Sequence, residues 1–313
     1  MKKLPWYCVL PLFVLLALTC TNVYLLDYFK VHDLALEKLP ALQEAKYNIT
    51  DLVRDWTARH LIQVGTVAFF FSATLVTGSS WYVILKSLAP FQHRKIFALG
   101  TLLLGSLIFV ILWTTVPIDT LNDSLAKMVQ NRTGIALDRL YDYMHCTGIS
   151  LLVWVTAAYT SVLVPDYRDK DTNKTTKSDE AFLHDRMIWT RTVLYTASIL
   201  FCVILAYHYG VTRWPVIYIA DKEAQEAVRQ LSHYSTMRFG FYYTLVLISV
   251  YLPAEVVLRL RANKLARDAG VEDMNAMDGW LKARGLRLSL LEEAPHTIAV
   301  VSPLIAGISS QIT

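Results

Sequence analysis

Long apolar stretches recur along this chain, separated by polar segments. Six of them run for roughly 20 residues with few or no charges, which is the length that a helix needs to cross a hydrocarbon core about 30 Å thick. Backbone N–H and C=O groups have no water partners in hydrocarbon, so each isolated stretch is predicted to be a helix. The predicted spans cover residues 5–26, 61–85, 96–116, 146–164, 189–207 and 239–258.

The polar segments between the spans alternate in character. Residues 27–60, 117–145 and 208–238 carry apolar side chains at helical spacing, which predicts amphipathic helices. Examples of this spacing are Leu121, Leu125 and Met128, and also Ala224, Val228 and Leu231. The pattern therefore predicts a bundle of three successive helical hairpins, each with an amphipathic segment on the same outer side.

The last part of the chain, residues 259–313, is predicted to form a helical tail on the opposite side. The helix of the sixth span continues to Arg267, and Gly270 suits the left-handed position beyond a helix end. A second helix is expected from Glu272 to Arg284. An apolar run at 297–312 is too short to span comfortably, so it is expected to dock under the bundle, insert partway or pack against another subunit.

The composition agrees with a membrane protein. Hydrophobic residues make up 54% of the 313 residues and charged residues only 18%, against about 25% charged residues in ordinary soluble domains. The fold class is therefore all-α, as a polytopic six-transmembrane-helix bundle. The net charge of +4 is small and the basic residues are scattered along the chain. The sequence therefore lacks the clustered basic patch that is typical of nucleic-acid-binding proteins.

The distribution of Lys and Arg predicts the orientation. Placing the N-terminus inside assigns 18 basic residues to the cytoplasmic side and 12 to the outer side. We therefore expect a multi-pass protein of the cell membrane with both termini in the cytoplasm. The first span has an alternative interpretation as a cleaved export signal, but its apolar run continues past Cys20 to Leu26 and is long enough to cross.

The most specific chemical hypothesis concerns four histidines near the outer ends of the spans. They are His60, His145, His208 and His233. Two histidines facing each other on neighbouring helices can hold a haem, and three can hold a metal ion. No carboxylate occurs at metal-motif spacing, so no cofactor is predicted, the metal is unknown, and haem is kept as a hypothesis only.

The second and third spans contain small and hydroxylated residues that permit close helix packing or line a pore. These are Ser72, Thr74, Thr77, Gly78, Ser79, Ser80, Gly100 and Gly105. Glu255, near the inner end of the sixth span, is expected to snorkel to the interface or stay solvated, and Asp185 and Arg186 are expected to be solvated loop charges. No catalytic signature is found, and the protein is not expected to be an enzyme.

The leading functional prediction is a non-enzymatic membrane component that acts through assembly or partner binding, as a sensor or scaffold does. Its expected partners are the lipid bilayer and either further copies of itself or another membrane protein. The alternatives are an oligomeric channel for ions or small solutes and a membrane haem or metal protein that uses the outer histidines.

Overall fold

The computed structural model describes residues 49–88, 94–115, 123–134, 137–164, 176–287 and 290–309. Within this part the chain is helical and contains no strand. Its elements are α3 (Ile49–Ser87), α4 (Arg94–Thr115), α5 (Asp123–Thr133), α6 (Leu137–Leu163), α7 (Thr176–Arg213), the short 3₁₀ helix η2 (Trp214–Tyr218), α8 (Lys222–Asp268), α9 (Met274–Ala283) and α10 (Leu290–Ser309). The predicted span at 5–26 lies outside the described residues.

Four of the described helices are long and apolar enough to cross a membrane, which supports the prediction of a helical membrane protein. They are Val53–Ser87, Cys146–Leu163, Asp179–Tyr218 and Lys222–Asp268. Helix α4 covers residues 96–115 of the predicted span at 96–116, although the apolar stretch found within it, Leu99–Ile111, is shorter than the other four. The count of six spans and the arrangement as three hairpins stay predictions.

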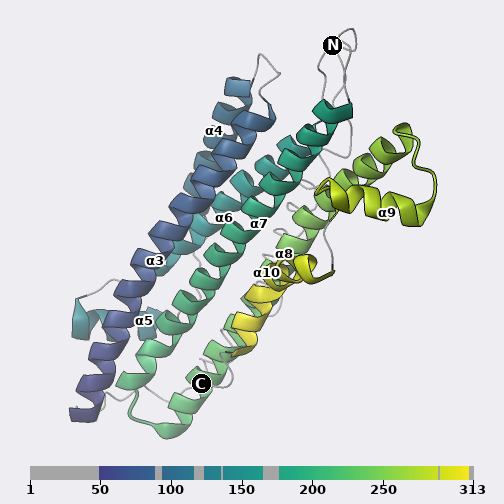
Figure 1. The fold of residues 1–313 in the computed structure, drawn as a ribbon. Coiled ribbons are helices and arrows are strands. Elements are labelled where there is room, and N and C mark those ends of the chain that lie inside the picture. Colours follow the sequence, from purple (N-terminus) through teal and green to yellow (C-terminus); the bar gives the residue numbers. More distant parts are fainter. Residues whose placement is uncertain are drawn as a thin grey trace.

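Six helices, α3, α4, α6, α7, α8 and α10, run side by side along one direction (Figure 1). Helices α5 and η2 lie in contact at one end of this bundle, and α9 packs on α8 at the other. We call these the η2 end and the α9 end. Helices α7 and α8 are antiparallel and are joined through η2, so the connection between them lies at the η2 end.

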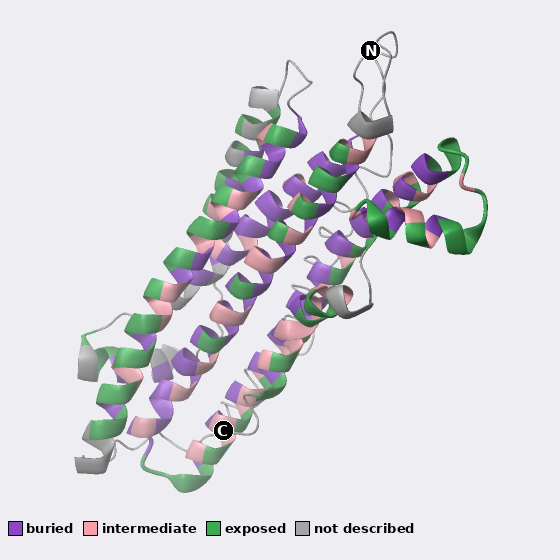
Figure 2. Cartoon of the chain, viewed as in Figure 1, coloured by how far each residue is buried: buried purple, intermediate pink, exposed green. Residues whose placement is uncertain are grey.

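The centre of the bundle is built from α6, α7 and α8, while α3 and α4 expose much of their apolar surface (Figure 2). In the centre, Phe201 of α7 stacks on Tyr243 of α8 with ring centroids 4.6 Å apart. On α3, Val64, Val67 and Phe71 are each more than half exposed. A contiguous apolar outer surface is unfavourable in water but suits contact with hydrocarbon.

Helix α8 is a single unbroken helix of 47 residues, about 70 Å long at 1.5 Å per residue. It begins where the Asp221 side chain accepts a hydrogen bond from the Ala224 backbone N–H at 2.8 Å. The amphipathic stripe predicted for the third outer segment forms its first turns rather than a separate helix, because no Gly or Pro interrupts residues 222–239. The predicted stop is confirmed, since Gly270 follows the helix with a φ of +84°.

Helix α10 lies within the bundle, against α7 and α8, so the apolar run at 297–309 does not dock beneath the membrane helices. Two glycines permit this close approach. A Cβ at Gly240 of α8 would lie 2.6 Å from the Pro303 carbonyl oxygen, and a Cβ at Gly307 of α10 would lie 3.1 Å from the Met237 Cα. Side chains at these two positions would separate the helices, so the sequence needs glycine at both.

A proline in α10 opens its backbone to hydrogen bonds from neighbouring helices. Pro303 lacks an N–H and leaves the Ala299 carbonyl without its helical donor. The Ser198 hydroxyl of α7 donates to this carbonyl at 2.7 Å. One residue after the proline, the Leu304 N–H donates to the Thr244 hydroxyl of α8 at 3.1 Å. These bonds satisfy the interrupted backbone inside the bundle, as an apolar environment requires.

Candidate functional site

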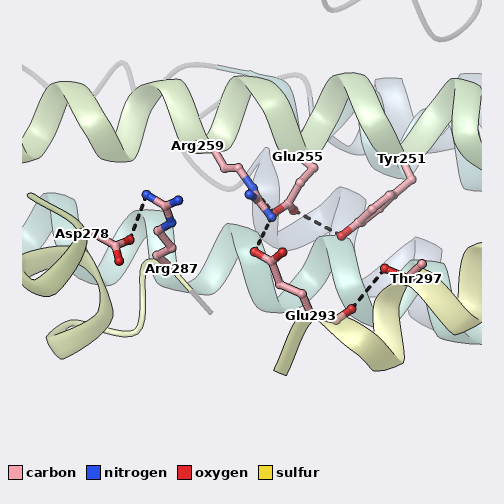
Figure 3. Close-up of polar contacts among 7 residues, drawn as sticks. All are labelled: Tyr251, Glu255, Arg259, Asp278, Arg287, Glu293 and Thr297. Carbon is pink, nitrogen blue, oxygen red and sulfur yellow. Dashed lines mark hydrogen bonds and ion pairs between the residues drawn. The ribbon is translucent and has the colours of Figure 1, made fainter. Parts of the chain in front are cut away.

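A charged cluster joins α8 and α10 at the α9 end (Figure 3). Arg259 of α8 donates from Nε to Glu255 Oε1 at 2.8 Å and from Nη2 to Glu293 Oε1 of α10 at 2.7 Å. The Tyr251 hydroxyl donates to Glu255 Oε2 at 3.4 Å. A spacing of four residues places Tyr251, Glu255 and Arg259 on one face of α8. We call these three residues, together with Glu293 of α10, the Arg259 cluster.

The Arg259 cluster corrects one expectation. Glu255 is 7% exposed, so it is not a solvated interfacial charge. A buried carboxylate needs a cation and hydrogen-bond donors to offset its loss of water, and Arg259 and Tyr251 supply them. The spacing of Glu255 and Arg259 is visible in the sequence, but their pairing with Glu293 is not, because Glu293 comes from another helix.

A cavity of about 410 Å³ lies beside the Arg259 cluster, between α8 and α10. It is lined by Ile248, Tyr251, Leu252, Glu255, Val256, Arg259, Glu293, His296, Thr297 and Val300. His296 Nδ1 is hydrogen-bonded to the Tyr195 hydroxyl, which ties α10 to α7 as well. Arg259 and His296 Nδ1 thus contact groups on other helices, whereas the Thr297 hydroxyl donates within α10 and the buried His296 Nε2 has no hydrogen-bond partner in the described part of the chain.

Buried Arg186 joins the ends of two other helices at the same end of the bundle. It is 2% exposed, and it donates to the Ser161 carbonyl of α6 at 2.8 Å and to the Ser87 carbonyl of α3 at 2.7 Å. Arg261 of α8 donates to the Leu163 carbonyl at 2.5 Å. The last carbonyls of a helix lack internal donors and carry its negative partial charge, so guanidinium groups stabilise them.

The expectation that Arg186 is a solvated loop charge is therefore wrong. Helix α7 begins at Thr176, well before the apolar run at 189–207, so Arg186 belongs to a helix and faces its neighbours. The sequence gives one signal that was missed. The aromatic residues Phe182 and Trp189 lie four before and three after Arg186, and the guanidinium is 4.7 and 5.5 Å from their ring centroids.

The predicted histidines occupy different surroundings. His60 is exposed, and its Nδ1 lies 2.9 Å from the Trp56 carbonyl oxygen. His208 is buried, with Nε2 2.9 Å from the Ser235 hydroxyl. The His233 ring packs on Tyr209 with centroids 5.5 Å apart, and the His145 side chain lies outside the described residues. Among the described side chains no group of three or more His, Cys, Asp or Glu could hold a metal, and the haem hypothesis stays a prediction.

The small and hydroxylated residues of α3 and α4 are partly used in packing. Ser79 lies 3.0 Å from the Thr196 hydroxyl of α7, and a Cβ at Gly105 would lie 3.1 Å from Trp154 Nε1. The others are buried (Ser72 and Ser80), half-buried (Thr77) or exposed (Thr74, Gly78 and Gly100). None of the eight lines the cavity at the Arg259 cluster. Ser79 and Gly105 therefore have packing contacts, and their proposed pore role stays a prediction.

Asp55 is a buried acid at the η2 end that sequence reasoning did not single out. It accepts hydrogen bonds from Trp214 Nε1 at 3.0 Å, from the Tyr218 hydroxyl and from Arg59 Nε at 2.8 Å. Trp214 and Tyr218 lie one turn apart in η2, so Asp55 fixes η2 against α3. The sequence does not reveal this site because only Arg59 lies near Asp55 along the chain, one helical turn away. Trp214 and Tyr218 lie more than 150 residues away from Asp55 in the sequence.

Comparison with known proteins identifies no relative. The chain matches no model of a known protein family, no curated protein and no solved structure.

Proposed function

We propose that this protein is a non-enzymatic membrane component that works by binding a protein partner at the α9 end, either a second copy of itself or another membrane protein. It would lie in the cell membrane with the α9 end in the cytoplasm. The observation that carries this proposal is the way the C-terminal unit is held. Helix α10 is seated in the bundle, while α9 stays outside it on the extension of α8.

The C-terminal unit is attached to the membrane helices at several points. Arg259 pairs with Glu293, and Arg284, which follows α9, donates to Glu180 of α7 at 2.8 Å. Helix α9 turns Met277 and Leu281 inward and leaves Met274 82% exposed. Such an arrangement presents a defined helical surface at a fixed position, which suits partner binding of the sensor or scaffold type.

Helix α8 supports coupling between the two sides of the membrane. It begins beside η2, contributes the Arg259 cluster and ends beside α9 without a break. A rigid element that reaches both ends can transmit a shift at one end to the other, provided that it has two arrangements. The channel and the haem or metal protein stay alternative predictions, and no observation among the described residues favours either.

Site-specific photocrosslinking in native membranes tests this proposal. A photoreactive amino acid at Met274 is expected to give a discrete protein adduct, whereas the same group at Leu103, an exposed position on α4, is expected to give lipid adducts. Gly240→Leu should unseat α10 and weaken the Met274 adduct. Gly78→Leu is the matched control, because a Cβ at Gly78 meets nothing within 4 Å. Monomer alone from Met274, under conditions that crosslink Leu103 to lipid, would contradict the proposal.

A further inference from the structure

The cavity at the Arg259 cluster has a polar end and an apolar side. Arg259, Glu255 and Glu293 meet at the polar end (Figure 3). Leu252 and Val256 of α8 line the apolar side, and both are exposed on the outer surface of the bundle. The cavity therefore reaches the surface that suits contact with hydrocarbon. Its volume of about 410 Å³ lies in the usual range of small-molecule sites.

Each carboxylate of the Arg259 cluster has one oxygen that is weakly engaged. Arg259 donates to Oε1 of Glu255 and to Oε1 of Glu293. Among the described residues, Glu255 Oε2 accepts only from the Tyr251 hydroxyl at 3.4 Å, which is long for a hydrogen bond. Glu293 Oε2 accepts no hydrogen bond from the described residues, and the Glu293 side chain is 28% exposed. The two carboxylates can therefore accept further hydrogen bonds from a ligand.

The charges at the cavity are of both signs. Glu255 and Glu293 carry two negative charges on its lining, and Arg259 carries one positive charge. Arg191 of α7 lies outside the lining but adds a second positive charge, since it interacts electrostatically with His296 on the cavity wall. A ligand head with a net charge would be attracted by one pair of these groups and repelled by the other. A zwitterionic head can place each of its charges beside the opposite one.

A buried nitrogen on the cavity wall also favours a polar occupant. His296 Nδ1 is hydrogen-bonded to the Tyr195 hydroxyl, whereas the buried Nε2 has no hydrogen-bond partner in the described part of the chain. A buried polar atom without a partner costs free energy. A polar head that enters beside His296 can satisfy this nitrogen, and an alkyl chain cannot.

We propose that this cavity binds the head of an ethanolamine lipid, with its ammonium group on Glu293 and Glu255, its phosphate on Arg259 and its chains along Leu252 and Val256. Ammonium N–H groups donate to carboxylates, and guanidinium groups donate to phosphates, through charge-assisted hydrogen bonds. Arg259 directly follows the predicted span at 239–258, which is the depth at which lipid heads lie. The site goes beyond the proposed partner binding, because its ligand is a lipid and not a protein.

Native mass spectrometry of the purified protein in a neutral detergent tests the site. The probes are three lipids with the same dioleoyl chains. Phosphatidylethanolamine and phosphatidylcholine are both zwitterionic, but the quaternary nitrogen of phosphatidylcholine has no N–H, and phosphatidylglycerol is an anion. The wild-type protein is expected to bind phosphatidylethanolamine about tenfold more tightly than phosphatidylcholine, because only the former donates to the carboxylates. Equal binding of these two lipids, or tighter binding of phosphatidylglycerol, would overturn the proposal.

Two pairs of variants locate the binding. Glu293→Gln removes a charge from the cavity and is expected to lose most of the preference for phosphatidylethanolamine, whereas Glu272→Gln, at an exposed position outside the lining, is expected to keep it. If Glu293→Gln does not fold, Leu252→Trp decides, since it narrows the cavity from an exposed position and should lower phosphatidylethanolamine binding to the level of phosphatidylcholine. Leu103→Trp on α4 is its control. A full preference in folded Glu293→Gln or Leu252→Trp protein would overturn the proposal.

Phosphoethanolamine, which is the same head without chains, distinguishes a lipid from a water-soluble ligand. At the concentration of the lipid it is expected to leave phosphatidylethanolamine bound, since it cannot cover the apolar side of the cavity. Displacement of the lipid would overturn the lipid part of the proposal and assign the cavity to a soluble zwitterion. Crosslinking at Met274 reports a protein partner, so its result is independent of each of these measurements.

Discussion

The two ends of this bundle use arginine in opposite ways. At the α9 end, Arg186 and Arg261 cap helix carbonyls, and Arg259 and Arg284 pair with carboxylates from other helices. At the η2 end, Arg54, Arg213 and Arg229 line one pocket whose described lining contains no carboxylate. The difference teaches that guanidinium groups at the α9 end are paired with backbone carbonyls and carboxylates inside the bundle, whereas at the η2 end Arg213 donates to the Tyr209 hydroxyl and Arg229 contacts the exposed carboxylate of Glu226.

Replacing Arg186 should have the largest effect on stability. Arg186→Met removes the donors to the Ser87 and Ser161 carbonyls, and each unsatisfied buried group costs about 1–3 kcal/mol. We expect the free energy of unfolding to fall by about 3 kcal/mol in detergent micelles, measured by titration with a denaturing detergent. Arg267→Met, at an exposed position on α8, is the control. Equal losses in both variants would show that Arg186 is not a structural cap.

Removing the cation of the Arg259 cluster should have an intermediate effect. Arg259→Gln leaves Glu255 buried without its cation, but Arg259 itself is 44% exposed and solvent screens the pair. We expect a loss of about 1–2 kcal/mol in the free energy of unfolding. Adding Glu255→Gln in the same chain should restore most of this loss, as a double-mutant cycle would show. A double variant less stable than Arg259→Gln would mean that the two residues act separately.

The sequence predicts four of the long apolar helices well, because hydrocarbon imposes a simple requirement on the length and polarity of a helix that could cross it. The spans at 61–85, 146–164, 189–207 and 239–258 all lie on helices that are long and apolar enough to cross. The helix ends at Gly270 and Gly285 were also predictable, because glycine favours the left-handed position beyond a helix end. Both glycines have a positive φ in the structure. These features depend on residues that are neighbours along the chain.

The sites could not be predicted in the same way, because their residues meet only through packing. Glu293 and His296 gain their partners from α8 and α7, and Asp55 gains two of its donors from η2. The seat of α10 depends on Gly240 and Gly307, which lie 67 positions apart, and on a proline whose freed carbonyl is satisfied by another helix. Hydropathy measures none of these contacts.

An arginine at the η2 end should contribute little to stability. Arg229 lies 3.7 Å from Glu226, whose side chain is exposed, so Arg229→Gln should change the free energy of unfolding by no more than about 0.5 kcal/mol in a neutral detergent. A loss as large as that of Arg186→Met would remove the contrast between the two ends.

The smallest effect on stability should come from lowering the pH, through the contacts of Asp278 at the α9 end. Asp278 of α9 contacts Lys282 at 2.7 Å and Arg287 at 2.9 Å, and the hydrogen bond from Lys282 and the charge of Arg287 lower the pKa of Asp278 below its usual range. A lowered pKa in the folded state means that the stabilisation is complete above the unfolded value of about 3.9 and is lost as the pH falls through the lower folded value.

Wild-type protein and Asp278→Asn should therefore differ slightly in melting temperature at pH 7 and should converge below about pH 3. Glu272→Gln, at an exposed position before α9, is the control and should show no such convergence. If the Asp278→Asn difference persisted unchanged in acid, the contacts with Lys282 and Arg287 would not hold α9, and the charge pairing that separates the α9 end from the η2 end would stop at the Arg259 cluster.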